Sequence, residues 1–149
     1  ISELGARGAI HEKFVAYGIF FPVGLALATV AFYTRSNEAA AMLAGVLAVG
    51  YIGSAFFPID PDAPAIGSLS NTIHGLIGGI QYIGAIAAIE IHARDLGFPF
   101  TLAKFAIIGF LVIHYIPYLR EVRGIYQRFV ETGLFGILIF FIVAFGPVT

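Results

Sequence analysis

The stretch AAAMLAGVLAVGYIGSAFF, residues Ala39 to Phe57, contains no charged side chain. A run of about 20 mostly apolar residues is the length at which an α-helix crosses the hydrocarbon core of a bilayer. Glu38 stands directly before this run and Pro58 directly after it, so the sequence marks both of its ends. The stretch therefore predicts a transmembrane helix over residues 39–57.

The rest of the chain repeats this pattern on both sides. A transmembrane β-barrel would instead show segments of about 10 residues in which apolar and polar side chains alternate. Continuous apolar runs favour helices, so we predict an all-α integral membrane bundle of five transmembrane helices, in a single domain over residues 1–149. The four further predicted spans cover residues 14–33, 73–91, 98–119 and 129–147.

The composition agrees with a membrane protein. Of the 149 residues, 59% are hydrophobic and 11% are charged, against about 45 to 50% and about 25% in an average soluble domain. So few charged side chains cannot cover the outside of a soluble domain, and membrane lipid is the expected partner of this surface. The formal net charge of −1 offers no basic surface and excludes nucleic acid as a partner. The chain has no cysteine, which excludes disulfides and thiolate metal sites.

Five crossings place three polar segments of the chain on the same side of the membrane. These segments are residues 1–13, 58–72 and 120–128, and we call the surface that they form face A. Ionisable side chains inside or at the ends of membrane spans are costly, and this makes them candidates for function. Most of those in this chain fall on face A.

Histidines and aspartates on face A could form a metal site. Three imidazoles with carboxylates are the ligand types of a zinc or iron centre that carries out hydrolysis. The alternative is that each histidine forms an ordinary hydrogen bond at a helix end and that no cofactor is bound, which we favour because no two of them have the short spacing of a typical metal motif. The candidate ligands are His11, His74 and His114, with Asp60 and Asp62 as candidate catalytic groups.

The segment PIDPDAP also has a purely structural interpretation. Proline restricts the backbone of the residue before it, and aspartate favours turns. Ser70 or Asn71 can cap the third helix. We therefore predict a folded cap over the end of the bundle, formed by Pro58, Asp60, Pro61 and Asn71.

Two further groups of residues are candidates for contacts. The guanidinium groups of face A can form ion pairs with its acids, or bind a lipid phosphate or a carboxylate. The candidates for head-group binding are Arg120, Arg123, Gln127 and Arg128. Gly75 and Gly79 are four residues apart on the third predicted helix, a spacing that allows close helix packing.

Three segments resemble a known family when they are taken together. They are SELGARGA (Ser2 to Ala9), FPIDP with His74 and Gly75 after it, and RGIYQR (Arg123 to Arg128), in this order. The set resembles the uncharacterised prokaryotic membrane proteins grouped as domain of unknown function 998. The resemblance implies the inner membrane of a prokaryotic cell and no particular activity. Members of the family usually have one more helix ahead of the first segment, so a longer parent would have six.

Three functions from different classes remain open. We favour a non-catalytic accessory, assembly or structural subunit of a larger membrane complex or homo-oligomer, because the chain is short, its loops are minimal and no strong catalytic motif occurs. The alternative is a metal-dependent lipid hydrolase that uses the histidines and aspartates of face A. Transport of a small solute ranks last, because the predicted spans show almost no polar groups at mid-depth.

Overall fold

The structure, a computed structural model, describes residues 2–62, 64, 66–114, 116 and 120–145. Throughout these residues the chain forms helices and loops and no strand. The elements are η1 (Ser2–Gly5), η2 (Phe14–Phe20), α1 (Phe21–Tyr33), α2 (Glu38–Phe56), α3 (Leu69–Leu96), α4 (Phe98–His114) and α5 (Arg120–Phe145). Eight side chains within these ranges lie outside the description, namely those of Ser2, Glu3, Arg94, Asp95, His114, Arg120, Glu121 and Arg123.

Among the residues that the structure describes, four helical segments are long and apolar enough to cross a membrane, which confirms the predicted all-α membrane bundle. The π-helical η2 continues directly into α1, and together they form the first of these segments. The segments are Phe14–Tyr33, Glu38–Phe56, Leu69–Ala93 and Gly124–Phe145.

The remaining helix, α4, is shorter than predicted. It has 17 residues, or about 25 Å at 1.5 Å per residue, against a hydrocarbon core of about 30 Å. It ends at His114, three residues before Pro117 in the sequence, and a proline disfavours helix in the residues that precede it. Residue 116 of the predicted span is not helical, and residues 115 and 117–119, which complete that span, lie outside the description.

Two other helices begin earlier than hydropathy predicts. Because polar residues can continue a helix when they have good helix propensity, α5 starts at Arg120 rather than at residue 129, and residues 120–128 are helix rather than loop. Helix α3 starts at Leu69, since the hydroxyl of Ser68 accepts a hydrogen bond from the backbone N–H of Asn71 at 3.2 Å. Ser68 is thus the N-cap, in place of the predicted Ser70 or Asn71.

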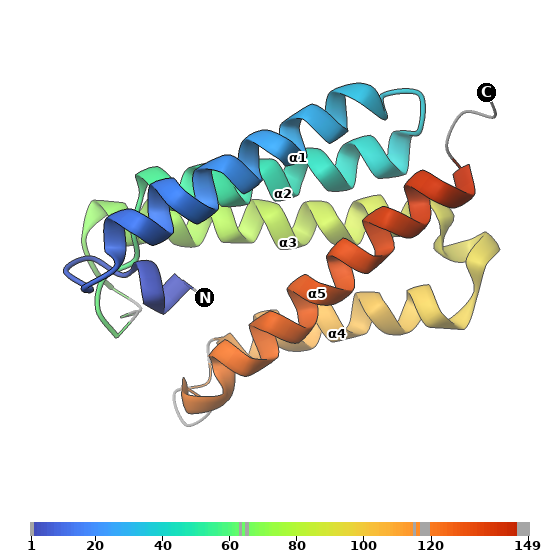
Figure 1. The fold of residues 1–149 in the computed structure, drawn as a ribbon. Helices are drawn as coiled ribbons and strands as arrows, with labels where there is room; N and C mark the ends of the chain where they lie inside the picture. The colour runs from blue at the N-terminus through green and yellow to red at the C-terminus, as the bar shows by residue number, and fades with distance from the viewer. Residues whose placement is uncertain (1, 63, 65, 115, 117–119, 146–149) are drawn as a thin grey trace.

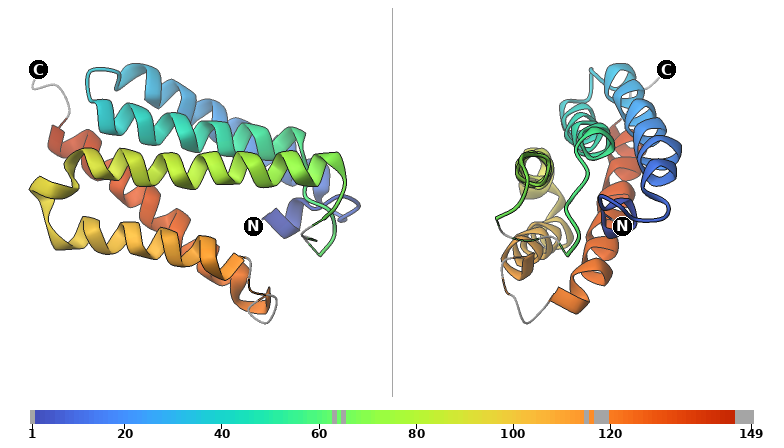
Figure 2. Two further views of the ribbon diagram at one scale, coloured as in Figure 1. Left: turned by 180° about the vertical axis from the view of Figure 1, so that it is seen from behind. Right: turned by 90° about the vertical axis from the view of Figure 1, so that its left-hand side faces the viewer.

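The helices form a layer of three and a hairpin of two. Helices α1, α2 and α3 lie side by side and antiparallel, while α4 and α5 lie to one side of that layer (Figures 1 and 2). Helix α5 runs obliquely, so that its C-terminal half approaches α2. The N-terminal segment, the described part of the α2–α3 connection and the start of α5 lie at the same end of the bundle, which is face A (Figure 1).

The core is built around α2, whose small side chains allow close contact with neighbouring helices. A Cβ added at Gly24 would lie 2.5 Å from Cγ1 of Ile52, so α1 needs a glycine there to approach α2. The residues expected to play this part, Gly75 and Gly79, have nothing within 4 Å of such a Cβ. No other described helix of this chain contacts the two glycines at these positions, and the helix packing expected of them stays a prediction. The largest fully buried side chains are Leu43, Leu47, Ile89, Leu134 and Phe141.

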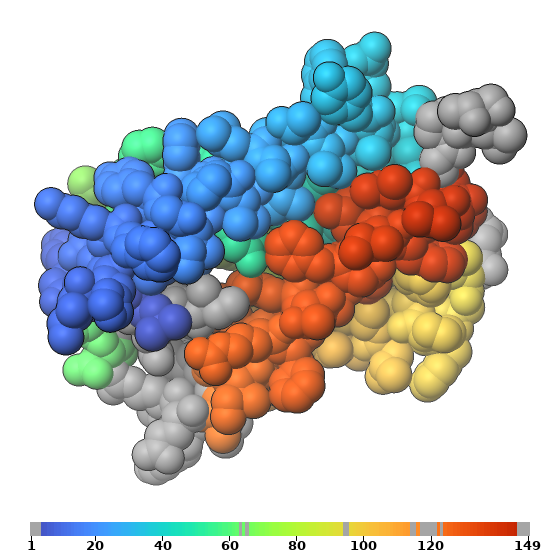
Figure 3. Space-filling view, viewed as in Figure 1, coloured from blue at the N-terminus to red at the C-terminus, as the bar shows by residue number. Residues whose placement is uncertain are grey.

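The outside of the bundle is apolar along the long helices. Phe32, Ile83, Phe105 and Val143 are examples of large apolar side chains that are exposed. Such side chains would be a liability in water and are the expected contact surface for lipid. In the space-filling view, α1, α5 and part of α4 lie on the same side of the molecule (Figure 3).

Candidate functional site

The loop between α2 and α3 folds around the carboxylate of Asp60, whose side chain is 15% exposed. One carboxylate oxygen accepts the backbone N–H of Ser68 at 2.6 Å and the other accepts the hydroxyl of Ser68 at 2.8 Å. The guanidinium of Arg7 lies 3.6 Å from the second oxygen. Both oxygens of Asp60 are therefore used in contacts within the loop end, which is our name for the α2–α3 loop with the start of α3 (residues 57–74) and the N-terminal segment that contacts it.

These contacts also fix the charge of Asp60. The hydrogen bond from the backbone N–H of Ser68, then that from its hydroxyl, and then the nearby charge of Arg7 lower the pKa of Asp60 below its ordinary value of 3.8, against the opposite effect of burial. The group remains an ionised acceptor at neutral pH. A carboxylate with a lowered pKa and occupied oxygens is a poor general base.

Further hydrogen bonds join the rest of the predicted cap. The backbone N–H of Asp60 donates to the side-chain oxygen of Asn71 at 3.1 Å, and the Asn71 amide donates to the carbonyl of Pro64 at 2.9 Å. The hydroxyl of Ser70 donates to the carbonyl of Pro58 at 2.8 Å. Pro61 follows Asp60 in the turn. The structure thus brings Pro58, Asp60, Pro61 and Asn71 into one compact loop.

The N-terminal segment is attached to this loop. The backbone N–H of Arg7 donates to the carbonyl of Ile59 at 2.9 Å, in addition to the ion pair with Asp60. Asp62 lies in the turn beyond, exposed and with a φ of 64°, a backbone conformation that aspartate adopts more readily than most residues. The N-terminal segment and the α2–α3 loop are therefore held together at face A by a backbone hydrogen bond and an ion pair of Arg7.

The histidines do not form a metal centre within the part of the chain that the structure describes. Nδ1 of His74 donates to the carbonyl of Phe57 at 2.8 Å, which ties the start of α3 to the end of α2. His11 is exposed in the turn before η2, and the side chain of His114 lies outside the description. Among the described residues, no three His, Asp or Glu side chains come together as metal ligands.

The candidates for head-group binding divide into two groups. Arg128 is exposed on α5, and the side chains of Arg120 and Arg123 lie outside the description. Gln127 instead donates its amide to Glu131 at 2.9 Å. It faces the bundle because residues four apart share one side of a helix.

The structure reveals a site that our sequence analysis missed, centred on Glu131 of α5. This carboxylate is 7% exposed and lies inside an apolar segment. One oxygen accepts the hydroxyl of Tyr82 at 3.1 Å and the amide of Gln127; the other accepts the hydroxyl of Tyr51 at 3.2 Å. The site thus joins α2, α3 and α5. A single acid within the fifth apolar run, with a glutamine four residues before it, was the signal in the sequence.

A second polar side chain lies next to this site. Gln81 precedes Tyr82 on α3 and is 6% exposed, and its side-chain nitrogen has no hydrogen-bond partner among the described residues. Its side chain lies against Gly50, which precedes Tyr51 on α2, and a Cβ at Gly50 would overlap it. Polar groups therefore do occur inside the bundle, although the sequence leads us to expect almost none at mid-depth.

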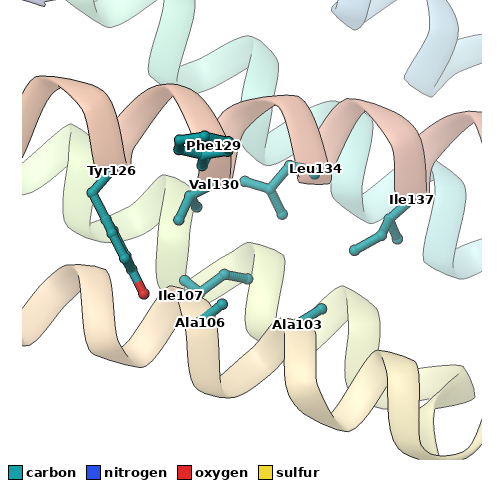
Figure 4. A pocket seen from close by; sticks show the side chains of 9 residues that line it. Ala103, Ala106, Ile107, Tyr126, Phe129, Val130, Leu134 and Ile137 are labelled. Carbon is teal, nitrogen blue, oxygen red and sulfur yellow. The ribbon is translucent and has the colours of Figure 1, made fainter.

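An apolar cleft of about 190 Å³ lies between α4 and α5. The hydroxyl of Tyr126 points across it from α5 towards α4 (Figure 4). The remaining wall is apolar and suits a hydrocarbon chain rather than a polar substrate. The lining residues are Ala103, Ala106, Ile107, Tyr126, Phe129, Val130, Gly133, Leu134 and Ile137.

Comparisons with known proteins identify the family. No curated protein and no solved structure matches this chain. The family model described as "Protein of unknown function (DUF998)" matches residues 1–146, nearly the whole chain. This match confirms the resemblance that the three sequence segments indicate. The chain belongs to the DUF998 family of proteins of unknown function.

Proposed function

We propose that this protein is a non-catalytic accessory, assembly or structural subunit of a larger complex or homo-oligomer, in the inner membrane of a prokaryotic cell. One observation carries the proposal. Asp60 and His74, two of the groups on face A best suited to chemistry, are already bound to groups of the loop end itself. Side chains used in this way stabilise a cap and are not available to a substrate.

Three glycines of α3 support a partner within the membrane. Gly75, Gly78 and Gly79 present backbone with open space beyond it, since a Cβ at any of them would meet nothing within 4 Å. Small residues four apart allow the backbone of a second helix to approach closely, which is how many membrane helices associate. The cleft between α4 and α5 supports lipid as a further partner.

Native mass spectrometry of the protein, extracted from its own membrane in a mild detergent, tests the proposal. We expect the chain to carry companion subunits or further copies of itself, and to carry no metal. Gly79→Leu should lower the fraction of this assembly by about tenfold or more, whereas Phe105→Leu on the exposed surface of α4 should leave it unchanged. A chain that is always alone would contradict the proposal. A mass excess of zinc or iron that is lost in His74→Ala would favour the lipid hydrolase instead.

Transport of a small solute is a second candidate, because Glu131 places an acid inside the bundle. Intramembrane acids commonly mark the routes of protons and cations. Flux of protons or small cations into vesicles that contain the purified protein, lost in Glu131→Gln, would favour this function. We rank it second because on α5 the side chains that follow Glu131 towards the other membrane face, Leu134, Leu138 and Phe141, are buried and apolar.

A further inference from the structure

An apolar groove of about 470 Å³ follows α2 on the side of the three-helix layer that faces away from α5. Tyr51 faces α5, because its hydroxyl donates to Glu131, whereas Val49 and Gly53, each two residues from Tyr51, line the groove. Residues two apart point to different sides of a helix. The groove therefore opens on the outer surface of the bundle, where the membrane lipid lies.

Small side chains of α2 form the floor of this groove. Gly45 and Gly53 lie on it, and a Cβ added at Gly45 would meet nothing within 4 Å. Ala28 and Ala31 line the groove from α1, and Ile77 lines it from α3. A lining made of such apolar residues suits a hydrocarbon chain.

A cationic side chain lies at the end of the groove opposite face A. Ala31 lines the groove close to the end of α1, and Arg35 follows in the α1–α2 turn, at the other end of the bundle from the N-terminal segment (Figure 1). The guanidinium of Arg35 lies over the exposed ring of Phe32, 4.9 Å from its centre, and is therefore directed back along α1. Arg35 is itself exposed. Its planar guanidinium can donate two hydrogen bonds to a phosphate.

The groove begins at a depth that an acyl chain of the same leaflet reaches. Ala28 lies five residues before the end of α1 at Tyr33, and Gly45 lies seven residues after the start of α2 at Glu38. These separations are about 8 and about 10 Å at 1.5 Å per residue. One leaflet contributes about 15 Å, half of the hydrocarbon core. A chain whose head group lies at Arg35 therefore enters the groove before it reaches the middle of the membrane.

The size of the groove favours an acyl chain over a helix of a partner protein. Gly45 and Gly53 are eight residues apart, or about 12 Å along the helix. A helix of this length, about 10 to 12 Å across with its side chains, has a volume of about 1,000 Å³, roughly twice that of the groove. An acyl chain is only one methylene group wide and can lie within the groove.

We propose that this groove binds a phospholipid from the leaflet opposite face A, with its phosphate on the guanidinium of Arg35 and one acyl chain along Ala31, Ala28 and Gly45. The apolar lining accepts the chain, and the cation at the end of α1 accepts the negative charge. The site is separate from the cleft between α4 and α5 and from the head-group candidates on face A. This inference goes beyond the role of an accessory subunit and is independent of it.

Native mass spectrometry with defined lipids tests the proposal. The protein in a mild detergent, after removal of bound lipid, is titrated with dioleoyl phosphatidylglycerol and separately with dioleoylglycerol, which has the same chains and no phosphate. We expect the phosphatidylglycerol to bind about tenfold more tightly, because only its phosphate can form hydrogen bonds with a charged guanidinium. Equal affinity for the two lipids would overturn the proposal.

Two variants test the position of the bound lipid. Arg35→Gln removes the cation, and Gly45→Leu fills the groove with a side chain that has open space in front of it. Each should weaken the binding of phosphatidylglycerol about tenfold. The matched controls, Arg128→Gln and Gly136→Leu at exposed positions of α5, should bind it like the unmodified protein. Full affinity in Arg35→Gln or in Gly45→Leu overturns the proposal, and so does an equal loss in Arg128→Gln, which would place the phosphate at face A.

A photoreactive lipid tests the same site in the unmodified protein, in case Gly45→Leu fails to fold. Phosphatidylglycerol with a diazirine halfway along one acyl chain is irradiated with the protein in nanodiscs, and the labelled peptides are identified by mass spectrometry. We expect Ala28 and Val49 in the groove to be labelled more strongly than the exposed Phe105 of α4. Labelling concentrated on α4 and α5 would overturn the proposal. An unlabelled groove in a protein that carries a second chain would also overturn it, because a partner helix then covers the groove.

Discussion

The hydroxyl of Tyr82 should contribute measurably to the stability of the bundle. Tyr82 is 6% exposed, and its ring packs against that of Phe110 with centroids 4.8 Å apart. Replacing it by phenylalanine leaves this packing intact and removes the hydrogen bonds of one hydroxyl, at 3.1 Å to Glu131 and with Gln127. The substitution therefore isolates the polar contacts of one hydroxyl between α3 and α5.

The size of the effect can be estimated from the chemistry of the bond. Hydrogen bonds between membrane helices contribute about 0.6 kcal/mol on average and reach about 1.7 kcal/mol, whereas bonds to charged groups in proteins contribute about 1.5 to 3 kcal/mol. Because the acceptor here is a buried carboxylate, we expect Tyr82→Phe to lower the free energy of unfolding by about 1 to 2 kcal/mol, or roughly 5- to 30-fold in the unfolding equilibrium.

Reversible unfolding in mixed micelles would measure this difference. Tyr33→Phe is the matched control, since Tyr33 is 76% exposed, and a surface change of this kind should stay within about 0.5 kcal/mol. In the double variant with Glu131→Gln, the effect of Tyr82→Phe should shrink, because the charged acceptor is gone. If Tyr82→Phe costs no more than Tyr33→Phe, the reasoning about Glu131 is refuted.

Three other substitutions test the packing, the cap and a helix end. Gly24→Leu should destabilise the bundle by about 1 to 3 kcal/mol because it overlaps its neighbour on α2; Gly75→Ala, where space is open, serves as the control and should be neutral or slightly stabilising. Folding lowers the pKa of Asp60, so its contribution to stability is complete above about pH 3.8 and is lost as the pH falls through the lowered pKa. Thermal melts of Asp60→Asn should lack this acid-dependent loss, and identical pH profiles would count against the cap. Asn37→Ala removes the N-cap hydrogen bond to the start of α2 and the 2.8 Å hydrogen bond to the carbonyl of Phe141. We expect it to lower the free energy of unfolding, measured by chemical unfolding, by about 1 kcal/mol or more. A smaller loss would be inconsistent with a stabilising role for both bonds.

The sequence predicts the number of long helices well, because each of them is marked by its own run of apolar residues. Helix ends are harder to predict, since α5 continues through the polar residues 120–128 without a change in backbone. Local turn chemistry also indicates the loop around Asp60, whose partner Ser68 is eight residues away in the same loop, while Arg7 comes from the N-terminal segment. Features that depend on residues close together in the sequence can therefore be predicted without the structure.

Features that depend on contacts between residues far apart in the sequence cannot be predicted in this way. The glycine that allows α1 to approach α2 is Gly24, while the more obvious pair of Gly75 and Gly79 faces outwards, because the orientation of each helix is set by its neighbours. Glu131 is a single acid in a long apolar run, and hydropathy averages conceal it. Its partner Tyr51 is 80 residues away in the chain, a distance at which periodicity carries no information.

The loop end has a consequence for the order in which the protein is made. Its hydrogen bonds join residues from Arg7 to His74, and all of these have been synthesised before most of α3. Because chains fold from the N-terminus during synthesis, the loop end can close while α4 and α5 are still on the ribosome. Tyr51 and Tyr82 then remain without their acceptor until the last helix enters the membrane. The arrival of Glu131 is thus a late event in biogenesis, at which the three-helix layer and the hairpin become one bundle.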